Sequence, residues 1–161
     1  MMEKIAVFVD VQNVYYTTKE HYKRNFDYNS FWRLISENRE VVKAVAYAID
    51  KQDEKQRQFQ HILKSIGFEL KLKQFIQRSD GSAKGDWDVG ITLDVMEFAN
   101  LADTAILVSG DGDFDLLVEK VKHEFSVNVE VYGVPSLTAQ SLIDAATRYI
   151  PIKENLLMYQ K

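Results

Sequence analysis

The sequence predicts an α/β fold, a three-layer α/β/α sandwich around a mainly parallel five-stranded sheet. Two observations support this prediction. Residues 4–10 and 104–109 are continuous apolar runs, which are typical of strands covered on both faces. Strand-like runs also alternate along the chain with stretches of helical periodicity, and that alternation is typical of βαβ units with a parallel sheet.

Five segments have the patterns of strands. Residues 41–50 form a third, mostly apolar run, whereas residues 68–74 and 127–132 alternate apolar and polar side chains. Alternation with a period of two is typical of half-exposed strands, so we expect these last two at the edges of the sheet. With the two doubly buried strands at the centre, the predicted strand order is 3-2-1-4-5.

Five stretches between these strands have helical patterns. They are residues 30–38, 52–66, 86–101, 114–125 and 137–146. Only two prolines and seven glycines occur in the 161 residues, and neither a linker nor an internal repeat divides the chain. We therefore expect a single domain over residues 1–161, with a C-terminal tail at 151–161 in which Leu156, Leu157 and Met158 pack back on the core.

The composition and the N-terminus narrow the protein class. The chain contains no cysteine, which excludes a disulfide framework, thiolate metal ligands and a cysteine nucleophile. The apolar run at residues 5–9 is too short for the core of a signal peptide or for a membrane span. These features predict a cytoplasmic protein without a membrane partner.

The charges are unevenly distributed along the chain. The 20 basic and 24 acidic residues give a net charge of −4. Residues 51–84 hold eight basic and four acidic groups, whereas residues 85–120 hold one basic and nine acidic groups. Such a local excess of acids indicates either a solvated helix face or a site that binds something positive.

Several of these acids are predicted to meet at one edge of the sheet. Asp10 ends the first strand, and Asp111 and Asp113 follow the fourth, where the strand order places the topological switch point. Asp86 and Asp88 begin the helix after the third strand, at the same edge. Clustered carboxylates repel one another unless a cation is bound, and ligands that are all oxygen suit Mg²⁺ or Mn²⁺. One or two such ions can promote phosphoryl displacement by water.

Each acid also has a simpler interpretation. Asp86, Asp88 and Asp113 stand where predicted helices begin, and a lone aspartate at such a position is commonly an N-cap. Asp10 ends a strand, and no helix is predicted directly after it that its side chain could cap. The convergence of all these acids on one edge therefore favours a metal site over a set of separate caps.

Three motifs resemble those of one known family. They are Phe-Val-Asp-Val-Gln-Asn at residues 8–13, Lys-Gly-Asp-Trp-Asp-Val at 84–89 with a later Leu-Asp at 93–94, and Leu-Val-Ser-Gly-Asp-Gly-Asp-Phe at 107–114. In order and spacing they are similar to the motifs of NYN domains, and in particular to the LabA-like group of the PIN-domain-like nuclease superfamily. The resemblance covers about residues 4–150. It implies a PIN-like fold and metal-dependent cleavage of RNA.

The resemblance also implies roles for individual residues. The implied metal-binding and catalytic acids are Asp10, Asp88, Asp111 and Asp113. Asn13 and Ser109 would support them. Asp94 matches an acid that recurs in the group, and two roles are open for it: a further metal ligand, or an acid outside the ligand set.

Basic and aromatic residues near the motifs are candidate RNA contacts. Arg78 and Lys84 approach the second motif and could hold phosphates. Tyr15 and Tyr16, predicted in a loop after the first motif, could stack on unpaired bases.

Three other residues near the motifs have simpler interpretations. Lys71 and Lys73 are most simply solubility charges of an edge strand. Trp87 shares a helical spacing with Ile91 and Val95, which indicates a buried stripe.

The predicted function is a Mg²⁺- or Mn²⁺-dependent endoribonuclease that hydrolyses RNA with a metal-activated water held by the clustered aspartates. The alternative is a non-catalytic RNA-binding or protein-interaction module on the same fold. A phosphatase or phosphotransferase with Asp10 as nucleophile is less well supported, because the position of the general acid in haloacid-dehalogenase-like enzymes is Gln12 here. RNA is the expected partner, bound with modest, ion-dependent affinity, and the strand at 127–132 could support a homo-oligomer.

Overall fold

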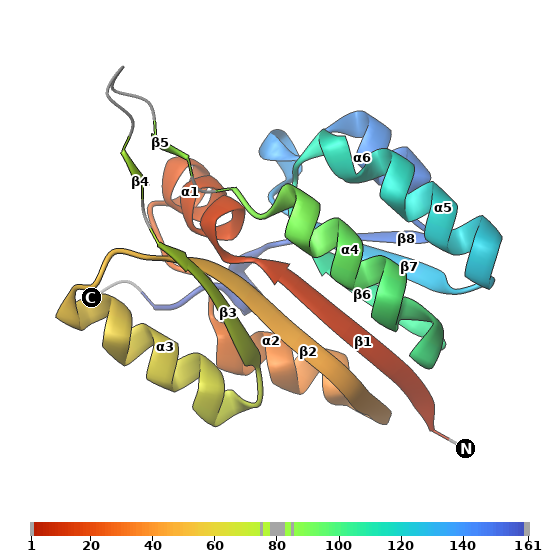
Figure 1. Cartoon of the computed structure of the whole chain (residues 1–161), viewed down its shortest axis with the longest axis horizontal. Helices are drawn as coiled ribbons and strands as arrows, with labels where there is room; N and C mark the ends of the chain where they lie inside the picture. The colour runs from red at the N-terminus through yellow and green to blue at the C-terminus, as the bar shows by residue number, and fades with distance from the viewer. Residues whose placement is uncertain (1, 75, 78–82, 85, 160–161) are drawn as a thin grey trace.

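The computed structural model describes residues 2–74, 76–77, 83–84 and 86–159. Within these residues it contains strands, α-helices and short 3₁₀ helices (Figure 1). The strands are β1 (Glu3–Asp10), β2 (Arg39–Asp50), β3 (Glu69–Gln74), β4 (Ile76–Gln77), β5 (Ala83–Lys84), β6 (Thr104–Val108), β7 (Asn128–Gly133) and β8 (Arg148–Pro151). The α-helices are α1 (Val11–Tyr22), α2 (Tyr28–Ser36), α3 (Glu54–Ile66), α4 (Asp88–Phe98), α5 (Asp115–Phe125) and α6 (Gln140–Ala145). The 3₁₀ helices are η1 (Ala99–Leu101), η2 (Gly112–Phe114), η3 (Pro135–Leu137) and η4 (Glu154–Leu156).

Six of the strands form one parallel sheet in the order β3-β2-β1-β6-β7-β8. The first five have the predicted order, but the predicted number of five is wrong because β8 adds a sixth strand. This strand has four residues and ends in Pro151. A proline has no N–H to donate and suits an edge strand, and a run this short carries little periodicity for a prediction.

Strand β7 is an interior strand, contrary to the prediction for residues 127–132. It pairs with β6 on one side and with β8 on the other, and five of its six residues are buried. Its charged member, Glu130, is itself only 9% exposed, so at this position the alternation of the sequence does not reflect contact with water. The reason for expecting a homo-oligomer through this strand is therefore removed.

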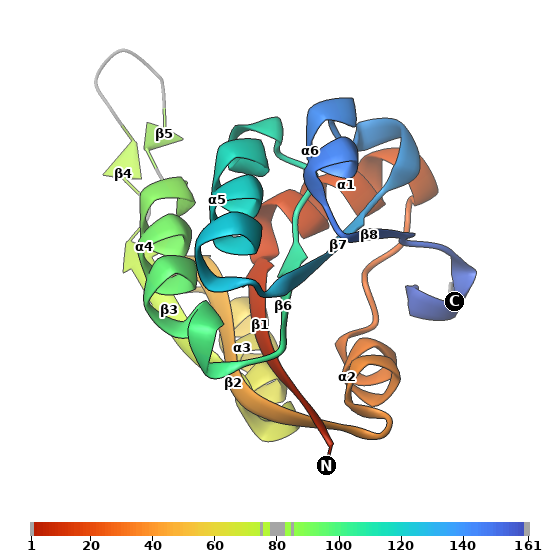
Figure 2. The same ribbon diagram turned by 90° about the vertical axis from the view of Figure 1, so that its right-hand side faces the viewer.

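Helices cover both faces of the sheet (Figure 2). In β1, Ile5, Val7 and Val9 belong to a core with residues of α1, α2 and α3, whereas Ala6 and Phe8 belong to a second core with residues of α4, α5 and α6. A continuous apolar strand is thus buried on both sides, as predicted, and the three layers are present.

Helix α1 has no counterpart among the predicted helices. Only Val11, Val14 and Thr18 of its residues are buried, so the apolar stripe is narrow and includes a threonine. Thr18 is accommodated because its Oγ1 donates to the carbonyl of Val14 at 2.8 Å. Tyr15 and Tyr16, which were predicted in a loop, lie on this helix and are 52% and 54% exposed.

The remaining helices differ from the predictions mainly at their ends. The helix predicted at 86–101 begins at Asp88 and passes into η1 after Phe98, and the helix predicted at 137–146 begins only at Gln140, after η3. In the C-terminal tail Leu156 and Leu157 are buried, as predicted, but Met158 is 49% exposed, contrary to the prediction. Among the residues described, no helix combines the length and the apolar character needed to cross a bilayer.

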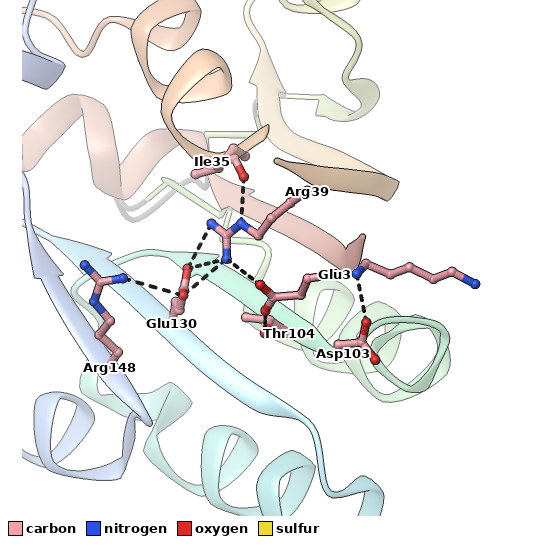
Figure 3. Close-up of polar contacts among 8 residues, drawn as sticks. Glu3, Ile35, Arg39, Asp103, Thr104, Glu130 and Arg148 are labelled. Carbon is pink, nitrogen blue, oxygen red and sulfur yellow. Dashed lines mark hydrogen bonds and ion pairs between the residues drawn. The ribbon is translucent and has the colours of Figure 1, made fainter. Parts of the chain in front are cut away.

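Arg39, the first residue of β2, connects several strands of the sheet (Figure 3). Its Nη1 lies 3.3 Å from both carboxylate oxygens of Glu130 in β7, and its Nε donates to the carbonyl of Ile35 at 2.9 Å. Glu3 of β1 lies 3.8 Å from the same guanidinium, and Arg148 of β8 lies 3.9 Å from Glu130. The network therefore links β2, β1, β7 and β8.

Candidate metal centre

Asp10 lies where β1 passes directly into α1. It is the last residue of β1 and the N-cap of α1, and its Oδ1 accepts a hydrogen bond from the backbone N–H of Asn13 at 3.4 Å. The argument that an acid here has no helix to cap was therefore wrong, because α1 was not predicted. Asp10 is only 8% exposed, and capping does not require such burial.

Ser109 and Asn13 join the ends of β1 and β6. Ser109 Oγ donates to Asp10 Oδ2 at 3.2 Å and accepts the backbone N–H of Asp111 at 3.2 Å. Asn13 Oδ1 accepts the backbone N–H of Gly110 at 2.9 Å. Asp10 and Ser109 are 99 residues apart in the sequence, so these bonds fix two distant motifs relative to each other.

The turn after β6 carries the next two acids. Asp111 caps η2, because its Oδ1 accepts the backbone N–H of Asp113 at 2.9 Å. Asp113 itself lies inside η2 and is exposed, and α5 begins only at Asp115. The N-cap interpretation of Asp113 is therefore wrong, and its carboxylate is not used to start a helix.

Asp86 and Asp88 flank the start of α4. Asp88 is the first residue of the helix, and its backbone N–H donates to Asp86 Oδ1 at 3.1 Å. Trp87 occupies the N-cap position and forms no side-chain cap. Neither aspartate stands at the N-cap position itself, and Asp86 uses one oxygen to hold the turn.

The aspartates of these three segments converge. Asp88, Asp111 and Asp113 each offer a carboxylate oxygen, and the three oxygens lie within 4.8 Å of one another. Asp10 and Asp88 also line one pocket. The other described residues that line it are Gln12, Asn13, Tyr16, Asp86 and Asp111.

Two of the clustered carboxyl groups hold protons more tightly than usual. The pKa of Asp88 is raised to about 7, first by burial, then by the charges of Asp111 and Asp86, by a hydrogen bond with Asp111 and by the charge of Asp10. The pKa of Asp10 is raised to about 6, mainly by burial, although hydrogen bonds from Asn13 and Ser109 act in the opposite direction. Without a cation, the cluster therefore relieves its repulsion by taking up protons.

The donor set of this cluster fits a hard divalent cation. In an octahedral shell with bonds of about 2.1 Å, neighbouring oxygens lie about 3 Å apart and opposite oxygens about 4.2 Å apart. The spread of at most 4.8 Å among the oxygens of Asp88, Asp111 and Asp113 is close to this range. A ligand set made only of oxygens favours Mg²⁺ or Mn²⁺ over softer metals.

Asp94 lies in a different environment from this cluster. Its Oδ2 accepts a hydrogen bond from the hydroxyl of Tyr47 at 2.8 Å and another from Nζ of Lys71 at 2.7 Å. Burial, and then the hydrogen bond to Asp94, raise the pKa of Tyr47, so its hydroxyl stays protonated and donates. Lys71 was interpreted as a solubility charge, but here it forms an ion pair with a buried carboxylate.

The residues that were expected to contact RNA lie in different parts of the structure. Tyr16 lines the pocket of acids, whereas Tyr15 packs edge-on against Tyr16 with 5.7 Å between the ring centroids. Lys84 lies in β5, which pairs with β4 in a small antiparallel sheet. Arg78 lies outside the described residues.

Two residues that line the pocket were not among the predicted site residues. Gln12 lies two residues after Asp10 on the first turn of α1, and because this helix was not predicted, Gln12 was not expected to line the site. Asp86 was predicted at the same edge of the sheet but was not among the acids that the resemblance implied, although its place two residues before Asp88 in the same motif was a usable signal.

The fold and the acidic pocket agree with a comparison to known families. The family model of the NYN domain matches residues 4–153. The chain belongs to the NYN domain family. This NYN domain is 26% identical over 159 residues to the low amplitude and bright protein LabA of Synechococcus elongatus, in an alignment that covers 94% of this chain and 84% of LabA.

A solved structure is also similar to this NYN domain. A protein of unknown function from Vibrio parahaemolyticus is 59% identical, and its crystal structure matches with a TM-score of 0.93 over 98% of this chain and 97% of that one. The resemblance that the three motifs carried, to NYN domains and to LabA, is thus confirmed, and the family is a nuclease-like one.

Proposed function

We propose that this NYN domain, acting as a single domain in the cytoplasm, is a Mg²⁺- or Mn²⁺-dependent endoribonuclease. The observation that carries the proposal is the cluster of Asp88, Asp111 and Asp113, whose oxygens lie within 4.8 Å of one another beside the buried Asp10. A protein that only binds RNA gains nothing from carboxylates that repel phosphate, whereas a metal-dependent hydrolase needs them.

The aspartates would hold one or two divalent ions. Bound there, such an ion supplies activation of a water molecule and stabilisation of the leaving oxygen in phosphodiester hydrolysis. Asp88, Asp111 and Asp113 are the ligands of the first ion in this proposal, and Asp10 shares the pocket with two of them. Ser109 and Asn13 keep these acids in place through the bonds that join the ends of β1 and β6.

Several side chains are proposed to hold the RNA. Tyr16 lines the pocket and exposes about half of its surface, so its ring can stack on an unpaired base next to the acids. Tyr15 supports the ring of Tyr16 by its edge-on contact. Lys84 and Arg78 remain proposed phosphate contacts, which would position the strand without reading its sequence.

The deciding experiment is cleavage of labelled single-stranded RNA, double-stranded RNA and DNA with Mn²⁺ or Mg²⁺. We expect cleavage of RNA that stops when EDTA is added. The variants Asp10→Asn and Asp88→Asn should be inactive, whereas Asp144→Asn, which changes an exposed aspartate of α6, should cleave normally.

Other outcomes favour the other hypotheses. Retained RNA binding without cleavage in any metal would favour a non-catalytic module. Release of phosphate from small phosphoesters, lost in Asp10→Asn and unaccompanied by RNA cleavage, would favour a phosphatase.

A further inference from the structure

Trp87 stands between the two acids at the start of α4, and its indole is bound to the sheet. The indole Nε1 donates to the carbonyl of Ala48 in β2 at 2.8 Å. The ring packs on Tyr47 of the same strand, with 5.4 Å between ring centroids and 55° between the planes. The turn that carries Asp86 and Asp88 is therefore attached to β2 through this one side chain.

Lys73 of β3 holds the same turn from a second strand. Its Nζ lies 4.5 Å from the centroid of the Trp87 ring, and it donates to the backbone carbonyl of Asp86 at 3.0 Å. One cation thus contacts both the indole and the peptide beside it. A cation over a tryptophan face is attracted to the ring, so Lys73 keeps the indole in position.

Asp94 holds Tyr47, the residue against which the indole of Trp87 packs. Its carboxylate accepts a hydrogen bond from the hydroxyl of Tyr47, and the ion pair with Lys71 holds that carboxylate in place. Asp94 is only 8% exposed, although it lies six positions after Asp88 on the same helix. Among the described residues, the Asp94 carboxylate contacts Tyr47 of β2 and Lys71 of β3, and Tyr47 in turn packs on Trp87.

The first turn of α4 leaves room for the indole because position 90 is a glycine. A Cβ added to Gly90 would lie 2.5 Å from Cε3 and 2.9 Å from Cζ3 of Trp87. These are atoms of a rigid ring that already contacts Tyr47, Lys73 and the Ala48 carbonyl, so the ring cannot move away without breaking those contacts.

We propose that Trp87 is a positioning residue of the metal centre: its indole, fixed by β2 and β3, sets where Asp86 and Asp88 lie relative to the acids that follow β1 and β6. The inference rests on the proposed metal site and deepens it. It also assigns Asp94 a role through Tyr47 and Trp87, outside the set of metal ligands. Residues that orient metal ligands without touching the metal commonly change metal affinity about 10–100-fold when they are mutated.

The test is Mn²⁺ affinity, measured by calorimetric titration of the metal-free protein, which does not depend on activity. Trp87→Phe keeps a ring against Tyr47 and removes the bond to the Ala48 carbonyl, and we expect the Mn²⁺ dissociation constant to rise about 10-fold. The matched control is Trp32→Phe. Trp32 packs on Phe68 on the other face of the sheet, so its loss should lower stability without changing Mn²⁺ affinity.

Gly90→Ala provides a second, independent variant. Alanine is a better helix former than glycine, so a purely local effect would stabilise α4. Displacement of the indole should instead weaken Mn²⁺ binding by a factor similar to that of Trp87→Phe. Asp94→Asn should weaken Mn²⁺ binding only partly, whereas Asp88→Asn should abolish it.

The outcomes separate the two proposals. A wild-type protein that does not bind Mn²⁺ would refute the proposed metal site and with it the proposed function. If the wild type binds Mn²⁺ and both Trp87→Phe and Gly90→Ala bind it equally well, the positioning role of Trp87 is wrong while the metal site stands. An equal loss of Mn²⁺ affinity in Trp32→Phe would also overturn the positioning role, because general destabilisation would then explain the effect.

Discussion

One carboxylate oxygen of Asp88 and one of Asp111 lie within 4.8 Å of each other, although Asp88 begins α4 and Asp111 follows β6. After burial, the charge of Asp111 is the largest cause of the raised pKa of Asp88. A bound divalent cation would offset this repulsion, and its binding would displace the proton that Asp88 holds at low pH.

Stability of the metal-free protein should depend on pH. The pKa values of Asp10 and Asp88, about 6 and about 7, lie above the ordinary 3.8, so the neutral forms favour the fold. Their contribution is complete below about pH 4 and is lost as the pH rises through 6 and 7. We expect the melting temperature in EDTA to fall from pH 5 to pH 7.5, as measured by calorimetry.

Asp10→Asn is the variant that tests this assignment. A shift of about two pKa units corresponds to about 3 kcal/mol at one site, and asparagine removes it while keeping one oxygen that can accept the N–H of Asn13. The variant should be more stable than the wild type in EDTA at pH 7.5 and should lose less stability with pH. An equally steep fall in the variant would show that other groups cause it.

Mn²⁺ should stabilise the protein more at pH 7.5 than at pH 5. Metal ligands must be deprotonated, so binding competes with the protons that Asp10 and Asp88 hold at low pH. At 100 times the dissociation constant the expected gain is about 2.7 kcal/mol, measured as a rise in melting temperature. Asp113→Asn should reduce the gain, Asp144→Asn should leave it unchanged, and a gain that is the same at both pH values would contradict the carboxylate site.

The pair of Arg39 and Glu130 should be important for stability but not for metal binding. Both side chains are largely buried, at 16% and 12% exposure, and removal of one partner from such a pair commonly costs about 3–5 kcal/mol. We expect Glu130→Ala to lower the free energy of unfolding in urea by about this amount. Arg148→Ala, which removes a 70% exposed side chain 3.9 Å from Glu130, should cost less than about 1 kcal/mol.

A double substitution tests the reason for that cost. Arg39→Met combined with Glu130→Leu leaves no uncompensated charge, so it should be less destabilising than Glu130→Ala alone. If the double variant is as unstable as the sum of the single variants, the pair is not coupled in the way that the distances indicate.

Tyr16 should contribute more to RNA binding than Tyr15. Tyr16 lines the pocket, and stacking on one base is commonly worth about 1–3 kcal/mol, so Tyr16→Ala should weaken binding of single-stranded RNA at least about 5-fold. Tyr16→Phe should bind like the wild type. Fluorescence anisotropy in Mn²⁺ measures the affinity, and a larger loss in Tyr15→Ala than in Tyr16→Ala would place the base elsewhere.

The sequence by itself determined the order of the central strands and the edge at which the acids meet. Continuous apolar runs identify β1 and β6 as doubly buried, and the parallel arrangement brings the ends of both strands to one edge. Asp10 and Asp111 could therefore be placed together although they are far apart in the chain. Periodicity and turn positions are local properties of the sequence, and they were sufficient to predict the strand order and the position of these acids.

Only the tertiary structure decided the partners of the polar side chains. Because Glu130 interrupts the apolar residues of β7, the sequence predicted an edge strand there. In the structure Glu130 is paired with Arg39, which lies 91 positions earlier in the sequence. Asp94 lies 47 positions after its partner Tyr47, and no local pattern relates Trp87 to the carbonyl of Ala48. A buried polar group is stable only with a partner, and that partner can come from anywhere in the chain, so the contacts that hold the candidate metal site were decided by the tertiary structure.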